Sequence, residues 1–286
     1  MSIQLDKVQP KNKAQLKSLI DYAFNHNIYD LNFIDTSKIT DMSKLFMSCE
    51  YDFDVSSWDV SNVTNMSQMF YFCVNFNCDL SGWDVSNVKD MNHMFHKCEY
   101  FNCDLSNWDV SKVKNMNEMF SDCDDFDCDL SNWDVSNVTT MNNMFDGCDN
   151  FKAKGLENWN VSNVKNAHHM FNACNKFDCD LSSWDVSNMT NMSGMFAGCW
   201  NWTGKGIENW DVSNVKDMSY MFQFCNDLNC DLSGWDVSNV TNMRDMFDTC
   251  ERLECDLSNW NVSNVLDMRD MFTHCNKLTI PSWYKK

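Results

Sequence analysis

Sixteen cysteines recur at regular intervals along this 286-residue chain, and thiols in register could form disulfides or bind a metal ion. The first column of cysteines is Cys49, Cys73, Cys98, Cys123, Cys148, Cys174, Cys199, Cys225, Cys250 and Cys275. The second column is Cys78, Cys103, Cys128, Cys179, Cys230 and Cys255. Stacked strands lie ~4.8 Å apart and a disulfide requires Cα atoms ~4.4–6.8 Å apart, so a ladder of disulfides between coils is geometrically feasible.

Two features of the spacing favour free thiols over disulfides or zinc. The second column contains runs of three, one and two cysteines, which cannot all pair between neighbouring coils. Cys73 and Cys78 are not spaced like the ligands of a zinc ribbon or finger, and no histidine accompanies them regularly. We therefore predict small, buried, reduced cysteines, which suit a reducing compartment, with no metal site and no cofactor.

Aspartates form a second regular pattern. Asp35, Asp59, Asp84, Asp109, Asp134, Asp185, Asp211 and Asp236 each lie between an apolar residue and a valine or threonine, and Asn160 and Asn261 complete the column. One interpretation is that each carboxylate accepts a hydrogen bond from the following Ser-Asn backbone and holds a turn. The alternative is an acidic ladder on a concave face that contacts a basic partner or cations. The candidate partner-binding aspartates are Asp59, Asp84, Asp109, Asp134, Asp185, Asp211 and Asp236.

Catalytic groups are not evident in the sequence. The six histidines are irregularly placed, and His168 and His169 are typical of a solvated pair. No Ser/His/Asp or Cys/His arrangement, phosphate-binding glycine loop or isolated pair of carboxylates interrupts the repeat. We therefore predict that the protein is not an enzyme.

Two segments are one residue longer than the rest and lose the second cysteine. They are residues 151–156 and 202–207, and they contain Lys154 and Lys205. Insertions in repeats map to loops on one face, which is often the binding face. Trp200 and Trp202 lie outside the tryptophan column, so one of them could be exposed, and we include Trp202, Lys154 and Lys205 among the candidate partner contacts.

These residues are positioned by a repeat of 25 or 26 residues. Its marker is the tryptophan column Trp58, Trp83, Trp108, Trp133, Trp159, Trp184, Trp210, Trp235 and Trp260. Self-similarity at this period predicts a solenoid of about ten stacked coils, because one repeat cannot bury its apolar face alone. The phrase at 80–85 is similar to a leucine-rich-repeat strand, and the apolar spacing over 63–73 predicts a short helical arc.

The two ends depart from the repeat. Residues 1–33 are predicted to cap the stack, with an amphipathic helix at about 13–27. Residues 34–283 are the predicted solenoid and 284–286 a short tail. Pro281 would discourage further strand pairing at the last coil.

The charge of the chain excludes several classes of partner. A net charge of −19 argues against nucleic acid and anionic membranes, and favours cations or basic proteins. No apolar stretch is long enough to insert in a membrane, and residues 1–20 do not resemble a signal peptide. The composition does not determine the oligomeric state of the protein.

The repeat phrases resemble the BspA-like leucine-rich-repeat surface proteins. The resemblance rests on residues 34–42, 58–66, 69–73, 101–106 and 206–210, and it extends over 34–283. It implies a leucine-rich-repeat solenoid, adhesion or protein binding, and a bacterial or host-associated microbial source. It also implies a cell-surface or secreted location, whereas the absent signal peptide and the free thiols favour the cytoplasm; both stay open.

The function predicted from the sequence is a non-enzymatic scaffold for protein–protein interaction or adhesion, which uses its acidic repeat surface. The alternative is a cation-dependent or self-assembling structural repeat protein, suggested by the stacked aspartates and the exposed coil ends.

Overall fold

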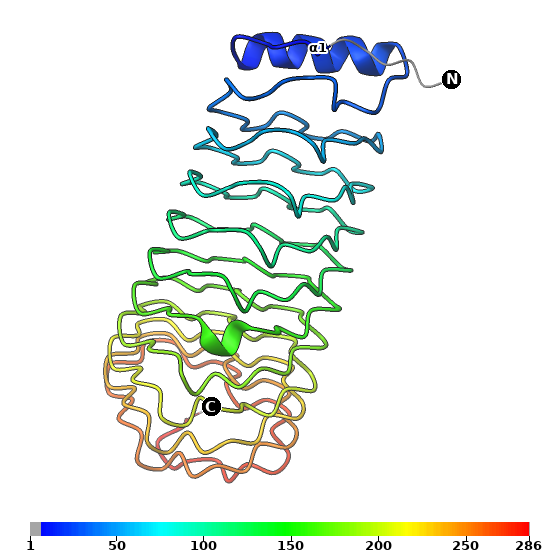
Figure 1. Ribbon diagram of the computed structural model, residues 1–286. Coiled ribbons are helices and arrows are strands. Elements are labelled where there is room, and N and C mark those ends of the chain that lie inside the picture. The colour runs from blue at the N-terminus through cyan, green and yellow to red at the C-terminus, as the bar shows by residue number, and fades with distance from the viewer. Residues whose placement is uncertain (1–6, 286) are drawn as a thin grey trace.

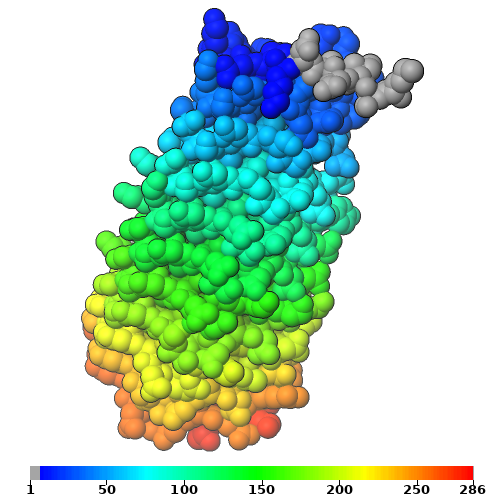
Figure 2. Space-filling model, viewed as in Figure 1, coloured from blue at the N-terminus to red at the C-terminus, as the bar shows by residue number. Residues whose placement is uncertain are grey.

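A computed structural model describes residues 7–285 as a stack of coils (Figure 1). Helix α1 (Lys13–Asn25) lies at one end, and the only other helical element in this range is the short 3-10 helix η1 (Leu156–Asn158). Successive coils are joined in parallel by single-residue bridges, which run from Asp41 through Asn65 and Asp90 to Asp267. The coils are packed against one another without gaps along the face seen in Figure 2.

Helix α1 covers the first coil. It begins after Asn12, whose side chain accepts a hydrogen bond from the backbone N–H of Gln15 at 3.0 Å. Its buried residues, Leu16, Ile20 and Ala23, join the core of the solenoid. A helix was expected over 13–27, and the observed helix ends two residues earlier.

The predicted helical arc is wrong. Within residues 7–285 the Met-Phe segments form consecutive β-turns, for example one in which the N–H of Met94 bonds the carbonyl of Met91 at 3.1 Å. His93 and Lys97 have φ of 54° and 59°, and the equivalent two residues of every coil are also left-handed. Turns and helices both bring residues three apart to the same side, so the apolar spacing did not distinguish them.

The left-handed residues change where the backbone hydrogen bonds go. The N–H groups of Met91, His93, Phe95 and Lys97 all point to the next coil, where they bond carbonyl oxygens at 2.8–3.3 Å. The same four bonds recur at each boundary between successive coils. All four donors therefore lie on one edge of a coil and all four acceptors on the other.

The predicted strand at the tryptophan is also wrong. The N–H of Trp83 bonds the carbonyl of Leu80 at 3.1 Å, which closes a β-turn over the phrase that was expected to be extended. No strand in residues 7–285 is longer than a single bridge. The structure is therefore a repeat solenoid, but its coils are not a strand followed by a helical arc.

Aromatic columns fill the interior. The indole Nε1 of Trp108 donates to the carbonyl of Leu80 in the preceding coil at 3.0 Å, and its ring stacks on Trp83 at 6.5 Å. A parallel column of phenylalanines includes Phe70 and Phe95, whose rings lie 5.5 Å apart. Each large buried side chain contributes ~1.5–3 kcal/mol, so the stack is stabilised chiefly by apolar burial.

Candidate interaction surfaces

The aspartate column is built into the turns. Oδ1 of Asp84 accepts from the backbone N–H of Ser86 at 3.0 Å, and Asp109 bonds Ser111 in the same way. Equivalent bonds are made by Asp59, Asp134, Asp185, Asp211 and Asp236. The turn interpretation is confirmed. Hydrogen bonding by the side chain and then the backbone of Ser86 lowers the pKa of Asp84, and Ser111 lowers the pKa of Asp109 in the same way, so both carboxylates are charged at neutral pH.

The same seven aspartates remain exposed to solvent. Each uses Oδ1 to hold its turn, and among residues 7–285 no hydrogen bond to the second carboxylate oxygen is present, so that oxygen can meet a partner. The structural role therefore explains why the residue recurs, and partner binding by the column stays a prediction.

Two more columns use the same turn. In one of them Asp79 accepts from Ser81 at 2.9 Å, and in the other Asn65 accepts from Ser67 at 2.9 Å. The Asn65 column coincides with the bridges between coils, and the sequence analysis did not single it out. The sequence does contain a pattern that marks this column, because an Asp, Asn or Thr precedes the first methionine or alanine of every Met-Phe phrase.

The lysines of the two longer coils fold back on the preceding coil. Nζ of Lys154 lies 2.6 Å from Oδ2 of Asp129, and Nζ of Lys205 lies 3.3 Å from Oδ2 of Asp180. Both lysines are exposed, so they interrupt the acidic surface while remaining accessible.

Trp202 cannot be a partner contact. Its side chain is fully buried, and its indole Nε1 donates to the carbonyl of Cys179 at 3.1 Å. It stands where other coils have Phe177 or Leu228, which explains why it points inward. Trp200 is the exposed member of the pair, at 54%.

The cysteines are free thiols in the structure, and the two columns have different surroundings. In the first column the Sγ of Cys123 donates to the carbonyl of Phe95 at 3.0 Å. In the second column the Sγ of Cys103 accepts from the backbone N–H of Leu80 at 3.0 Å. In the longer coil the carbonyl of Lys154 replaces that sulfur and accepts from Leu130 at 3.1 Å, so the loss of the second cysteine leaves no N–H unpaired.

A surface that the sequence analysis missed lies over the Met-Phe turns. It consists of the two residues between the methionines and the two that follow Met-Phe, from 43–44 and 47–48 in the first coil to 269–270 and 273–274 in the last. We call it the variable face, because these positions differ from coil to coil while the flanking Met, Phe and Cys recur. The bridges keep equivalent positions in register, so the four columns share one side of the stack.

Ionisable groups gather on the variable face of the third to fifth coils. Nε2 of His93 lies 3.1 Å from Oε2 of Glu118, and Nδ1 of the buried His96 lies 3.5 Å from the same oxygen. Burial lowers the pKa of His96, in spite of the nearby Glu118 carboxylate. Burial, with repulsion from Asp122 and Glu118, raises the pKa of Asp146 to about 6.

Aromatic side chains flank this cluster. Phe72 is 38% exposed, and the Lys97 ammonium lies 4.9 Å from its ring centroid. Further along the same face Phe224 is 45% exposed and Arg244 lies over the ring of Tyr220. Exposed aromatic residues next to charged groups are typical of contact hot spots.

Residues 7–285, the part of the chain that the structure describes, contain neither a metal-binding cluster nor a membrane-spanning helix. No three His, Cys, Asp or Glu side chains are grouped closely enough to hold a metal ion. No helix there has both the length and the apolar character to cross a bilayer.

The fold and these surfaces define a capped repeat solenoid whose coils are chains of β-turns. The chain belongs to the family described as Mycoplasma protein of unknown function, DUF285, whose model matches residues 14–133, 114–204 and 190–285. No curated protein matches the chain. A solved chain titled "Crystal structure of TLR13-ssRNA13 complex" aligns with 96% of this chain at 10% identity and a TM-score of 0.25. The aligned region spans 49% of that chain.

Proposed function

We propose that this protein is a non-enzymatic scaffold that binds a protein partner along its variable face. The observation that carries the proposal is that structural residues and variable surface residues occupy separate positions within each coil. Recurring residues are used in stacking, turns and the core, whereas the positions over the Met-Phe turns vary more from coil to coil, as His96, Ser121 and Asp146 show at one of them. Surface positions that are not needed for stacking can carry different residues in different coils, and such a surface can recognise a particular partner.

The acidic columns contribute attraction rather than selectivity in this proposal. The exposed carboxylates and the net charge of −19 favour a basic partner. Such charges mainly raise the association rate and make binding dependent on salt. They contribute less to the geometry of the bound complex. Adhesion, which the BspA-like resemblance implies, would be one use of such a surface.

Paired substitutions test which surface binds. The immobilised protein is used to capture partners from lysate, and retention is compared with that of Phe72→Ser/Phe224→Ser. Serine is compatible with this left-handed position, because Ser48 occupies it in the first coil with a φ of 58°. Tyr22→Ser on α1 is the control, because Tyr22 is 58% exposed and lies off the variable face.

We expect the double substitution to abolish retention of a partner that the Tyr22 variant still captures. Equal retention by all three proteins would contradict binding along the variable face. Retention that is lost only in Asp84→Asn/Asp109→Asn/Asp134→Asn would place the contact on the acidic column.

The alternative function is a cation-dependent or self-assembling structural repeat protein, and it is supported by the aspartates that occupy equivalent positions in successive coils. A cation-dependent version would require calcium to bind the aspartate columns, and calorimetry with calcium distinguishes it from the scaffold.

A further inference from the structure

A cleft of about 450 Å³ lies on the variable face, over four successive coils in the first half of the stack. Its lining includes Tyr71 and Phe72 from one coil and His96 from the next, followed by Glu118 and Asp146 from the two coils after that. The cleft therefore brings aromatic rings and carboxylates together from segments that are far apart in the sequence.

Asp146 is a half-buried carboxylate without a counter-ion from its own chain. It accepts a hydrogen bond from the side-chain amide of Asn172 at 2.7 Å, and it forms no ion pair with any basic side chain of residues 7–285. Lys97 also lines the cleft, but its Nζ lies 3.9 Å from Oδ2 of Asp122. Because an uncompensated, partly buried carboxylate is unfavourable, the cleft favours a cation that enters from outside.

His96 supplies an unused polar atom beside the second carboxylate. The residue is 8% exposed, and its Nδ1 forms no hydrogen bond, although Oε2 of Glu118 lies 3.5 Å away. Burial lowers the pKa of His96, so the ring is neutral at neutral pH and has one acceptor nitrogen. An N–H donor placed between Glu118 and His96 would satisfy both side chains.

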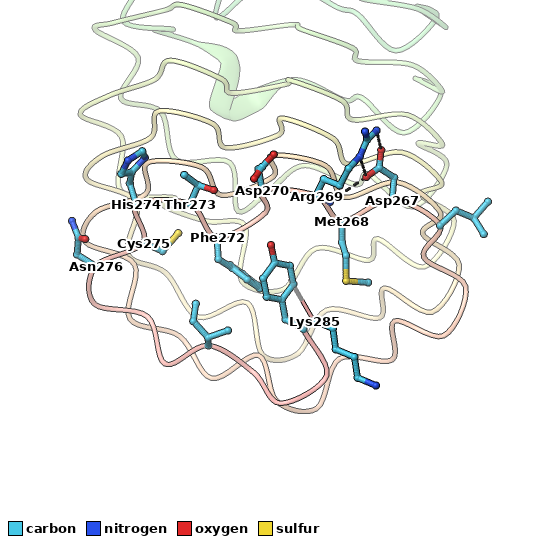
Figure 3. A pocket seen from close by; sticks show the side chains of 13 residues that line it. Asp267, Met268, Arg269, Asp270, Phe272, Thr273, His274, Cys275, Asn276 and Lys285 are labelled. Atoms are coloured by element: carbon cyan, nitrogen blue, oxygen red, sulfur yellow. Dashed lines mark hydrogen bonds and ion pairs between the residues drawn. The ribbon is translucent and has the colours of Figure 1, made fainter.

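Arginines of the same chain show how such groups pair elsewhere in the stack. Nε of Arg244 bonds Oδ2 of Asp245 at 2.9 Å, and its guanidinium carbon lies 5.9 Å from the ring centroid of Tyr220. Arg269 bonds both carboxylate oxygens of Asp267, at 2.9 and 2.6 Å (Figure 3). In both cases a guanidinium group compensates a carboxylate, and in the first it also lies near an aromatic ring.

The coils that line the cleft have asparagine where those two arginines stand, at Asn92, Asn117 and Asn142. Carboxylates and aromatic rings are present there without a guanidinium group. A guanidinium suits such a site, because it is planar, has five N–H donors and packs against aromatic rings. Within residues 7–285 no three His, Cys, Asp or Glu side chains are grouped to hold a metal ion, so an organic cation fits the cleft better.

We propose that this cleft binds an arginine side chain of the partner protein. The guanidinium group bonds the carboxylates of Glu118 and Asp146, lies against the rings of Tyr71 and Phe72, and directs one N–H toward Nδ1 of His96. The inference rests on the proposed function, because it names the chemical group that the variable face recognises.

N-acetyl-arginine amide provides the probe, and an NMR titration of the histidine ring protons at neutral pH provides the measurement. The probe is expected to shift the His93 and His96 signals saturably and to leave those of His168 and His169, which do not line the cleft, unchanged. N-acetyl-citrulline amide has a similar shape without the charge and is expected to cause no saturable shift. N-acetyl-lysine amide is expected to bind about threefold more weakly, because an ammonium group lacks the planar fork of donors.

Three substitutions that each remove one negative charge separate the cleft from the general acidity of the protein. Glu118→Gln and Asp146→Asn are each expected to weaken binding of the arginine probe about tenfold, the cost of one charge-assisted hydrogen bond. Both replacements suit their positions, because Gln68 has a φ of 58° at the position equivalent to Glu118 and Asn172 stands at the position equivalent to Asp146. Asp21→Asn, at an exposed position of α1, is the matched control and is expected to bind the probe as the unsubstituted protein does.

Four results would overturn the inference: a shift that does not saturate, equal shifts with the citrulline derivative, equal affinity for the lysine derivative, and equal affinity of the three variants. Capture of partners from lysate keeps the proposed function separate. A protein that captures a partner but does not bind the arginine probe would contradict this inference alone. A protein that binds the probe in the cleft but captures no partner would contradict the proposed function instead.

Discussion

The thiol of Cys98 donates a hydrogen bond to the carbonyl oxygen of Phe70 in the preceding coil, with 3.1 Å between sulfur and oxygen. The same oxygen accepts the backbone N–H of Cys73 at 2.9 Å, so both of its lone pairs are used. The contact recurs from Cys73 to Cys275. Cysteine suits the position because it is small, apolar and still a donor.

Thiol titration should reveal this arrangement. Burial raises the pKa of Cys73 to about 12, and the other buried thiols shift in the same direction. The native protein is therefore expected to react slowly with a thiol reagent, with the half-buried Cys49, Cys78 and Cys255 reacting first. All sixteen thiols should react after denaturation without reductant. A smaller number under those conditions would reveal disulfides.

Gly155 tests the close approach of the longer coils. Its φ is 94°, and a Cβ there would lie 2.2 Å from the backbone nitrogen of Ser131. Gly155→Ala is expected to cost more than ~2 kcal/mol, because left-handed strain and a backbone clash add. Gly82→Ala is the control, since a Cβ at Gly82 meets nothing within 4 Å. Similar denaturation midpoints for the two variants would contradict this packing.

The architecture was easier to predict than the path of the backbone. The regular tryptophans require stacked coils, because no single repeat could bury them, and α1 follows from the apolar face at Leu16, Ile20 and Ala23. Turns and helix share the same apolar spacing, and what separates them is a positive φ. Residues as different as His93, Tyr220 and Thr249 adopt that φ, so residue type did not reveal it.

The candidate site was predicted less well, for reasons that particular residues illustrate. Asp84 recurs because its turn requires it, so recurrence identified structural residues instead of binding residues. Alignment of Trp202 with Phe177 would have placed it in the core. The variable face was missed because its residues do not repeat from coil to coil. These residues form one surface only when the coils are stacked in register.

Asp146 gives a prediction for pH dependence. Burial raises the folded-state pKa of Asp146 to about 6, above the ordinary value of an aspartate, so ionisation of this carboxyl opposes folding. The penalty is absent below about pH 4 and develops as pH rises through 6. Asp146→Asn keeps an acceptor for Asn172, which bonds Asp146 at 2.7 Å. The variant is expected to be ~1–3 kcal/mol more stable at pH 7 and unchanged at pH 3.5. Denaturant titration at both pH values checks this, and an equal gain at both would contradict it.

The aspartate column is tested by replacing Asp84, Asp109 and Asp134 together. Asparagine keeps the Oδ1 acceptor, as Asn160 shows by bonding the N–H of Ser162 at 3.1 Å. The loss of charge removes repulsion between neighbouring coils and also weakens the charge-assisted turn bonds, so the two effects oppose each other.

Because Asn160 and Asn261 already hold the same turn, we expect the triple asparagine variant to match or exceed the stability of the unsubstituted chain at neutral pH. Triple alanine substitution removes the acceptor and is expected to cost ~1 kcal/mol per site. Denaturant midpoints at low and high salt separate the two effects, because salt screens repulsion between exposed carboxylates. Equal destabilisation by asparagine and alanine would mean that the negative charge, rather than the hydrogen-bond acceptor, holds these turns.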